Sequence, residues 1–289
     1  MTAQAMIPGQ VRVVTRFAPS PTGRLHLGHA LSAIRAHALA RAAGGRFLLR
    51  IEDIDLARCR EDHVATILAD LDWLGIRWDG PVVRQSSRLA LYAAALDRLQ
   101  AQGLVYPCFC TRAEIAASAS APHGSDGAVY PGTCRSLRGA DLSRPHCWRL
   151  DMARAVALAK PLSWTDHGST VMADPAAQGD VVLARKDAPS SYHLAVTVDD
   201  ADQGVTDVVR GVDLFAATHV HRLLQALLAL PTPRYHHHAL LTDDRGERLA
   251  KRTGAPSLAA LREAGEDGRA IAAALARGEY RPRAALRGS

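Results

Sequence analysis

The first hundred residues alternate between short apolar runs and stretches whose apolar side chains recur at helical spacing. Residues 11–17 and 47–51 are rich in β-branched and apolar side chains, as is typical of buried strands. A helical stretch follows each run, the first from about Leu27 and the second from about Glu61, and glycines close both stretches. Strands that alternate with helices favour a parallel sheet covered by helices. We therefore predict an α/β fold with a Rossmann-like, doubly wound parallel sheet.

The stretch from Val105 to Trp148 interrupts this alternation. It holds three of the five cysteines and a patch over 116–127 that is rich in Ala, Ser and Gly, so we predict an inserted subdomain with a long loop. Strand and helix patterns then return, with strands expected at 181–183, 207–210 and 235–241 and helices near Leu194 and over 214–230. The predicted division is a first half of the sheet domain over 1–104, the insertion over 105–148, a second half over 149–241, and a lysine-containing loop with a short helical tail over 242–289.

The charge balance is mildly basic. The 289 residues include 35 basic and 29 acidic side chains, which gives 35 − 29 = +6. This balance fits a partner that carries phosphates, although a solvated basic surface explains it equally well. No apolar run reaches the roughly 18 residues that cross a bilayer, and residues 1–10 lack the basic and apolar blocks of a secretory signal. We therefore expect a cytoplasmic protein without a membrane partner.

Two histidines stand where the first predicted strand gives way to the first predicted helix. They are His26 and His29, with Gly28 between them. The start of a helix presents backbone N–H groups and the positive end of the helix dipole, so it attracts phosphate. Imidazole groups can add hydrogen bonds to charge that develops on phosphate oxygens, and Gly28 allows a flat ligand close to the backbone. The spacing from Gly23 to Gly28 is that of a P-loop, but the pair after Gly28 is His-Ala and not Lys-Ser/Thr, which excludes that motif.

A second basic motif lies late in the chain and reads Arg248-Leu249-Ala250-Lys251-Arg252. Lysine is scarce in this sequence, because arginine supplies 32 of the 35 positive charges. A lysine on a loop can close on phosphates and stabilise a leaving group. Taken singly, each of the two motifs is more often a structural or solvated feature than a site.

Together the two motifs resemble the class I aminoacyl-tRNA synthetases, which carry a His-x-Gly-His signature early and a Lys-Met-Ser-Lys-Ser signature late. Three further runs are similar to the glutamate-specific branch of that family, namely 17–23, 50–55 and 204–214. The resemblance covers about residues 11–252 and implies a Rossmann-like catalytic domain that activates an amino acid with ATP and Mg²⁺. In the late signature Arg248, Leu249 and Ala250 depart from the family pattern, and only Lys251 keeps its place.

The resemblance also implies which residues bind the substrates. The glutamate-binding set consists of Arg16, Phe17, Ala18, Pro19, Ser20, Glu52, Tyr192 and Arg210. The ATP-binding set consists of His26, Gly28, His29 and Lys251, and its two histidines and its lysine are the expected catalytic side chains. The chemistry agrees, because guanidinium forks suit carboxylates, a carboxylate suits an ammonium group, and hydroxyl groups add orienting hydrogen bonds.

Within this branch the short chain is similar to the glutamyl-queuosine tRNA(Asp) synthetases, which attach glutamate to the modified base queuosine in the anticodon loop of tRNA(Asp). The 38 residues after Lys251 are too few for a separate anticodon-binding domain. The expected partners are therefore ATP, L-glutamate and tRNA(Asp) bearing queuosine, and we expect a monomer. Two alternatives stay open: a glutamyl-tRNA synthetase that charges a tRNA 3′ end, and a non-catalytic RNA- or zinc-binding relative.

The cysteines of the insertion suggest one structural zinc ion per chain. Cys108, Cys110 and Cys134 offer three soft thiolate ligands. The family resemblance adds Tyr130 as the fourth ligand, but a phenolate is an unusual zinc ligand, so His123 and Cys147 remain rivals. Two buried thiols without a metal are the alternative explanation of the Cys-x-Cys pair. Cys59 is expected to be a plain thiol.

Three consecutive histidines, His236 to His238, invite a second metal-site interpretation. They lie on a predicted strand, where neighbouring side chains point to opposite faces of the sheet. We therefore do not expect them to bind one metal together.

Overall fold

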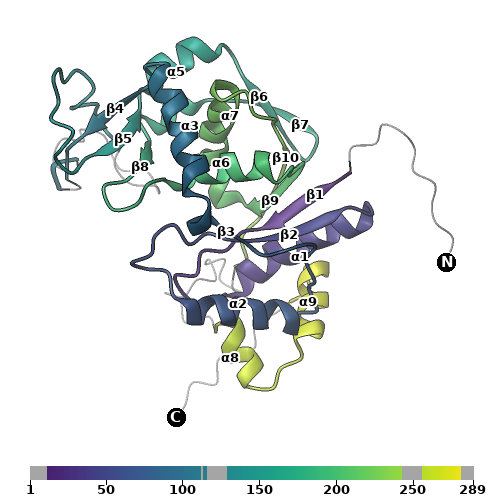
Figure 1. The fold of residues 1–289 in the computed structure, drawn as a ribbon. Coiled ribbons are helices and arrows are strands. Elements are labelled where there is room, and N and C mark those ends of the chain that lie inside the picture. The colour runs from purple at the N-terminus through teal and green to yellow at the C-terminus, as the bar shows by residue number, and fades with distance from the viewer. Residues whose placement is uncertain (1–11, 112, 116–128, 243–255, 281–289) are drawn as a thin grey trace.

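The computed structural model describes residues 12–111, 113–115, 129–242 and 256–280, and Figure 1 shows their arrangement. A first block of parallel strands joins β1 (Val14–Phe17) to β2 (Arg46–Ile51) and β2 to β3 (Val83–Arg84). In a second block β10 (Arg234–His238) lies parallel to both β9 (Asp207–Gly211) and β6 (Ser163–Asp166). The edge strand β7 (Ser169–Met172) pairs antiparallel with β6.

Thr206, just before β9, connects the two blocks. Its backbone N–H donates to the carbonyl of Val14 at 2.9 Å, and its hydroxyl accepts from the Val14 N–H at 2.8 Å. The strands therefore follow the order β3-β2-β1-β9-β10-β6-β7. From β1 the chain adds β2 and β3 toward one edge of the sheet, and from β9 it adds β10 toward the other edge, so the order of strand addition reverses between β1 and β9. Such a reversal is the topological switch point at which doubly wound sheets bind ligands.

The helices lie on both sides of these strands, as the doubly wound prediction requires. Figure 1 shows four of them below β1 and β2: α1 (Leu27–Ala42), α2 (Glu61–Trp73), α8 (Leu258–Glu263) and α9 (Gly268–Arg277). Above β1 and β2 lie α3 (Leu89–Ala101), α5 (Met152–Ala159), α6 (Tyr192–Asp202) and α7 (Phe215–Leu227), beside β6, β7 and β10. Single 3-10 turns occur at η1 (Gln85–Ser87), η2 (Pro175–Gln178) and η3 (Val212–Leu214). Two apolar clusters fill the two sides, one around Phe47 and Leu49 and the other around Leu183 and Leu224.

A separate antiparallel sheet interrupts the sheet domain. It consists of β4 (Val105–Cys108), β5 (Cys147–Leu150) and β8 (Val182–Ala184). The expectation that residues 181–183 return to the parallel sheet is therefore wrong. The physical reason is the buried Asp180, whose carboxylate accepts hydrogen bonds from Tyr106 of β4, from Arg135 and from the backbone of Met152, and so fixes the start of β8 beside β4 and β5.

Most other predicted elements are present, with shifted ends. The helix expected over 214–230 is α7, preceded by η3, and the strand expected over 235–241 is β10, which begins at Arg234 and ends at His238. Sequence analysis did not predict α5 or the β6–β7 hairpin, whose strands are only four residues long. Within the described ranges, no helix combines the length and the apolar character of a membrane span.

Candidate active site

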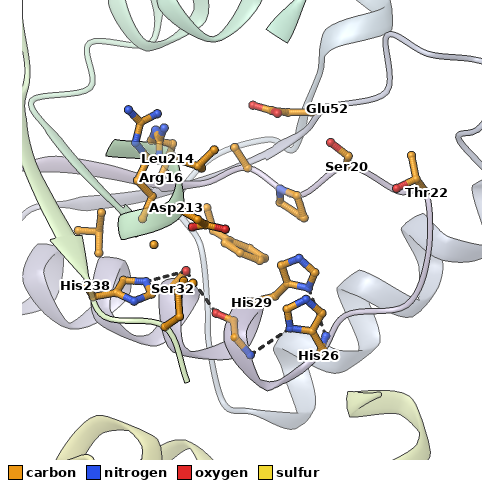
Figure 2. A pocket seen from close by; sticks show the side chains of 18 of the residues that line it. Arg16, Ser20, Thr22, His26, His29, Ser32, Glu52, Asp213, Leu214 and His238 are labelled. Atoms are coloured by element: carbon orange, nitrogen blue, oxygen red, sulfur yellow. Dashed lines mark hydrogen bonds between the residues drawn. The ribbon is translucent and has the colours of Figure 1, made fainter. Parts of the chain in front are cut away.

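A cavity of about 430 Å³ opens at the carboxyl ends of β1 and β9, at the switch point of the sheet (Figure 2). All the predicted glutamate-binding residues line it, and so do His26, Gly28 and His29 of the predicted ATP-binding set. The predicted late motif, with Lys251, lies outside the described residues. The structure thus gathers residues from four separate parts of the sequence around one space, in the position where doubly wound folds bind ligands.

The two histidines are held by the start of α1. His26 is the N-cap residue, and its Nδ1 accepts a hydrogen bond from the Gly28 N–H at 3.1 Å. The Nδ1 of His29 accepts from the His26 N–H at 3.2 Å, which completes a reciprocal capping box. The two rings stack with centroids 3.7 Å apart. Because both Nδ1 atoms accept, each neutral ring carries its proton on Nε2, which makes Nε2–H the donor of each ring.

Gly28 has a local reason to be glycine. A Cβ built at this position would lie 3.0 Å from Cε1 of His26. A larger residue would therefore require the His26 ring to shift by a few tenths of an ångström. The close contact with His26 is a structural reason for glycine at this position.

A chain of buried charges supports the floor of the cavity. Arg16 donates from Nε to Asp200 at 3.0 Å, and Arg50 donates from Nη1 to the same Asp200 oxygen at 2.9 Å. Arg50 also approaches Glu52 at 3.4 Å. Burial raises the pKa of Glu52, although Arg50 and Arg16 oppose the shift. Burial would likewise raise the pKa of Asp200, but Arg16 and Arg50 together hold it below its ordinary value.

Arg210, at the end of β9, has a different environment. It is only 5% exposed, and it donates to Tyr192, His237 and Thr218 at 3.1, 3.2 and 2.6 Å. All three partners are neutral groups. Among the described residues, no carboxylate forms an ion pair with Arg210, so its charge is buried beside the cavity without an acidic partner. A buried cation of this kind favours an anionic ligand.

Three histidines surround Arg210 and stay neutral near pH 7. Burial, assisted by the charge of Arg210, lowers the pKa of His193 and of His237 to about 4 and that of His221 well below its ordinary value. His221 Nδ1 lies 3.4 Å from Arg210, and its Nε2 lies 3.3 Å from His193. Neutral imidazoles can accept hydrogen bonds from the guanidinium without repelling it.

The roles of the residues that hold Arg16 and Arg210 in place were not predicted from the sequence. Asp200 lies on α6, His237 on β10 and Thr218 on α7, far from the motifs that revealed the site. Adjacent acidic residues in an apolar helix, at Asp199 and Asp200, were the one available signal, because buried carboxylates need partners.

The predicted metal ligands come together beside the antiparallel sheet. The sulfur atoms of Cys108, Cys110 and Cys134 lie within 4.8 Å of one another, and those of Cys110 and Cys134 are 3.5 Å apart. A tetrahedral zinc ion with Zn–S bonds of about 2.3 Å would hold its sulfur ligands about 3.8 Å apart, so the three thiols fit such an ion. Hydrogen bonds from the Cys147 and Tyr130 side chains outweigh burial and lower the pKa of Cys108 below its ordinary value, which favours the thiolate that binds metal.

Two of the rival fourth ligands can be compared. The Tyr130 hydroxyl lies 3.3 Å from the Cys108 sulfur and 3.6 Å from the Cys110 sulfur. The Cys147 sulfur lies 3.5 Å from the Cys108 carbonyl and within hydrogen-bonding reach of the Cys108 thiol, but it is not part of the three-sulfur cluster. His123 lies outside the described residues. Cys59 is a free, half-buried thiol.

Comparisons with known proteins agree with this geometry. The family described as tRNA synthetases class I (E and Q), catalytic domain, matches residues 12–286. The chain belongs to this family of ligases. A Glutamyl-Q tRNA(Asp) synthetase of Rhodobacter capsulatus is 53% identical in an alignment 272 residues long that covers 88% of this chain and 96% of that protein. A protein of the same name from Symbiobacterium thermophilum is 47% identical in an alignment 262 residues long that covers 86% of this chain and 81% of that protein.

Solved synthetase structures share the fold. A glutamate tRNA ligase from Elizabethkingia meningosepticum, crystallised in complex with its amino acid, superposes with a TM-score of 0.71 at 28% identity. The match covers 84% of this chain and 53% of that one, so the chain spans about half the length of this ligase. The glutamate-tRNA synthetase of Elizabethkingia anophelis gives a TM-score of 0.72 with the same coverage. The class I synthetase fold predicted from the sequence is therefore confirmed.

Proposed function

We propose that the protein activates glutamate with ATP as an adenylate and transfers it to queuosine in the anticodon loop of tRNA(Asp). The observation that carries the proposal is the buried charge of Arg210, which faces a cavity that also contains the histidine-capped start of α1. An amino acid with an anionic side chain supplies the missing counter-charge, and the helix start suits phosphates. The names of the curated relatives support the same substrates.

In this scheme the cavity residues orient glutamate. Arg210 takes one carboxylate, and Arg16, which already binds Asp200 through Nε, takes the other through its Nη groups. Glu52 pairs with the ammonium group, while Ser20 and the Tyr192 hydroxyl add orienting hydrogen bonds. Phe17, Ala18 and Pro19 form the part of the cavity wall between Arg16 and Ser20. Glutamine would leave the buried charge of Arg210 without a counter-ion, so the pocket discriminates against it.

Activation needs positioning and electrostatics and no side-chain nucleophile. An oxygen of the α-carboxylate bonds to the α-phosphorus of ATP, the bond from that phosphorus to the bridging oxygen breaks, and pyrophosphate leaves with the electron pair. The Nε2–H groups of His26 and His29 donate to the charged phosphate oxygens. Lys251 is proposed to add a positive charge to the leaving group. Mg²⁺, when bound to the phosphates of ATP, neutralises part of their charge.

We further propose that Cys108, Cys110, Cys134 and Tyr130 hold a structural zinc ion, and that residues 105–148 form a metal-binding unit together with β8. The three sulfur atoms support the first part and the pairing of β5 with β8 supports the second. A bound zinc ion would link the loop that follows β4 to the loop that precedes β5. Its contribution is to folding and not to the chemical step.

Two measurements test the proposed function. The first is ATP–pyrophosphate exchange, which should depend on glutamate and should not respond to glutamine. The second follows labelled glutamate on tRNA(Asp) prepared with and without queuosine. Label that resists removal of the 3′-terminal nucleotide and appears only with queuosine supports the proposal. Label on the 3′ terminal ribose would instead indicate an ordinary glutamyl-tRNA synthetase, and absence of exchange would indicate a non-catalytic relative.

A further inference from the structure

A fully buried guanidinium group lies beside the carboxylate that is proposed to bind the ammonium group of glutamate. Arg50 and Glu52 are two residues apart at the carboxyl end of β2, so their side chains leave the same face of the strand. Nη2 of Arg50 lies 3.4 Å from Oε1 of Glu52. The Arg50 side chain has no exposed surface, so it cannot contact a ligand itself. Any effect of Arg50 on the cavity must therefore pass through its neighbours.

The guanidinium group of Arg50 is shared among three carboxylates. Its Nη1 donates to Asp200 at 2.9 Å and to the side-chain oxygen of Gln203 at 2.7 Å. Its Nε lies 3.6 Å from an oxygen of Asp199. Glu52 is the third carboxylate, and of the three only Glu52 lines the cavity. The charge of Arg50 therefore reaches the amino-acid pocket through Glu52.

Glu52 depends on Arg50 for its counter-charge. Its side chain is only 9% exposed, and within the described part of the chain Arg50 is the one cation that forms an ion pair with it. The other titratable groups that act on the Glu52 carboxylate lie on β1 and α6 and are Arg16, Tyr192, Asp199 and Asp200. The two aspartates repel its charge, and the phenol is neutral near pH 7. Arg16 attracts it, but Arg16 is itself paired with Asp200.

We propose that Arg50 is a positioning residue that keeps Glu52 ionised, so that the cavity retains the negative charge that binds the ammonium group of glutamate. The inference rests on the proposed function and deepens it, because it names the residue on which ammonium recognition depends. Burial raises the pKa of Glu52, and Arg50 is the largest influence that opposes the rise. Without Arg50 the buried carboxyl group takes up a proton at a higher pH and loses its attraction for an ammonium group.

The pH dependence of glutamate use tests this role. Pyrophosphate exchange gives kcat/KM for glutamate, which should fall as the pH drops through the pKa of Glu52. In Arg50→Met the fall should begin about one pH unit higher than in the wild type, or higher still, because a nearby opposite charge shifts a pKa by about 1–3 units. The KM for glutamate should be raised at pH 7 and recover by pH 8.5. The KM for ATP should stay within about twofold of the wild type, because Glu52 lies across the cavity from His26 and His29 (Figure 2).

Arg88→Met is the matched control. Arg88 belongs to the same buried network, but its ion pairs are with Asp199 and Asp202 and not with Glu52. Its loss should lower the thermal midpoint and leave the pH at which kcat/KM for glutamate falls unchanged. Arg50→Lys keeps a positive charge in the network and should reverse at least half of the shift seen in Arg50→Met. A wild-type pH profile in folded Arg50→Met, or an equal shift in Arg50→Lys or Arg88→Met, would overturn the proposal.

A substitution of opposite sign covers the case in which Arg50→Met does not fold. Asp200→Asn keeps an oxygen that accepts from Arg50 but removes the negative charge that competes with Glu52 for it. The fall of kcat/KM for glutamate should then move to lower pH, by about 0.5 unit or more. A fall that stays in place or moves to higher pH counts against the proposal. A wild-type protein that shows no glutamate-dependent exchange would contradict the proposed function instead, so the two failures are distinguishable.

Discussion

Arg210 donates from Nε to Nε2 of His237 across 3.2 Å, between the ends of the adjacent strands β9 and β10. The other ring nitrogen of His237 lies 3.1 Å from a carboxylate oxygen of Asp166, which also accepts from the His237 backbone at 3.0 Å. Asp166 thereby holds the ring proton on Nδ1 and keeps Nε2 as an acceptor. Three neighbouring strands thus fix the direction of one guanidinium group.

His237 is therefore expected to position Arg210. His237→Phe leaves a buried N–H of Arg210 without a partner, which costs about 1–3 kcal/mol. If that cost falls on glutamate binding, the KM for glutamate should rise about fivefold to a hundredfold. His237→Gln supplies an amide oxygen in place of the ring nitrogen and should recover part of the loss. Pyrophosphate exchange at varied glutamate concentration gives the measurement, and a His237→Phe enzyme with wild-type KM would contradict the positioning role.

The same residue makes stability depend on pH. The pKa of folded His237 is about 4, against an unfolded value of about 6.5, so the unfolded chain binds more protons between these values. The contribution of the neutral ring is complete above about pH 6.5 and is lost as the pH falls toward 4. Between pH 7 and pH 5 this one group should lower the free energy of unfolding by about 2 kcal/mol.

Denaturant unfolding at the two pH values checks this expectation. The comparison is between the wild type and His237→Gln, because glutamine does not titrate. The variant should lose less stability than the wild type on going from pH 7 to pH 5. Equal losses in the two proteins would show that His237 is not responsible.

The site was predictable where its residues form a local pattern. His26, Gly28 and His29 fall within one turn of helix, so their chemistry is visible in a short stretch of sequence. Arg210 was found only through family resemblance, and its supports Asp166 and His237 were not found at all, because strand order and not sequence distance brings them together.

The fold shows the same division between local and long-range information. Helix and strand periodicity predicted the doubly wound sheet, but β8 carries the same apolar pattern as a parallel strand. Its assignment to the antiparallel sheet depends on the contacts of Asp180 with Tyr106 and Arg135. Such contacts cannot be read from spacing, since a short apolar strand fits either kind of sheet.

Three substitutions test the proposed zinc site and identify its fourth ligand. Cys134→Ser should abolish stoichiometric zinc, because a three-sulfur site loses a thiolate. Tyr130→Phe should weaken zinc binding by about tenfold or more, whereas Cys147→Ser should leave it near the wild-type value. Competition with a chromogenic chelator, together with the thermal midpoint, gives the readout. Loss of zinc in Cys147→Ser but not in Tyr130→Phe would assign the ligand to Cys147.

The two roles of His29 can also be separated. Its Nδ1 closes the capping box by accepting from His26, and its Nε2–H is the proposed phosphate donor. His29→Asn keeps an acceptor at the cap, but its shorter amide cannot place an N–H where the Nε2–H of histidine stands, so its thermal midpoint should stay near that of the wild type while the rate of pyrophosphate exchange falls about a hundredfold. His29→Ala should lose the rate to the same extent and, in addition, about 1 kcal/mol of stability.

The comparison of these two variants is informative because both remove the imidazole, yet only one removes the cap. If the rate followed the stability, with His29→Asn active and His29→Ala impaired, the histidine would serve the helix and not the phosphates. If both variants lose activity while only His29→Ala loses stability, the loss of rate belongs to the missing Nε2–H. Exchange at saturating glutamate and ATP, measured beside chemical unfolding of each variant, distinguishes the two cases.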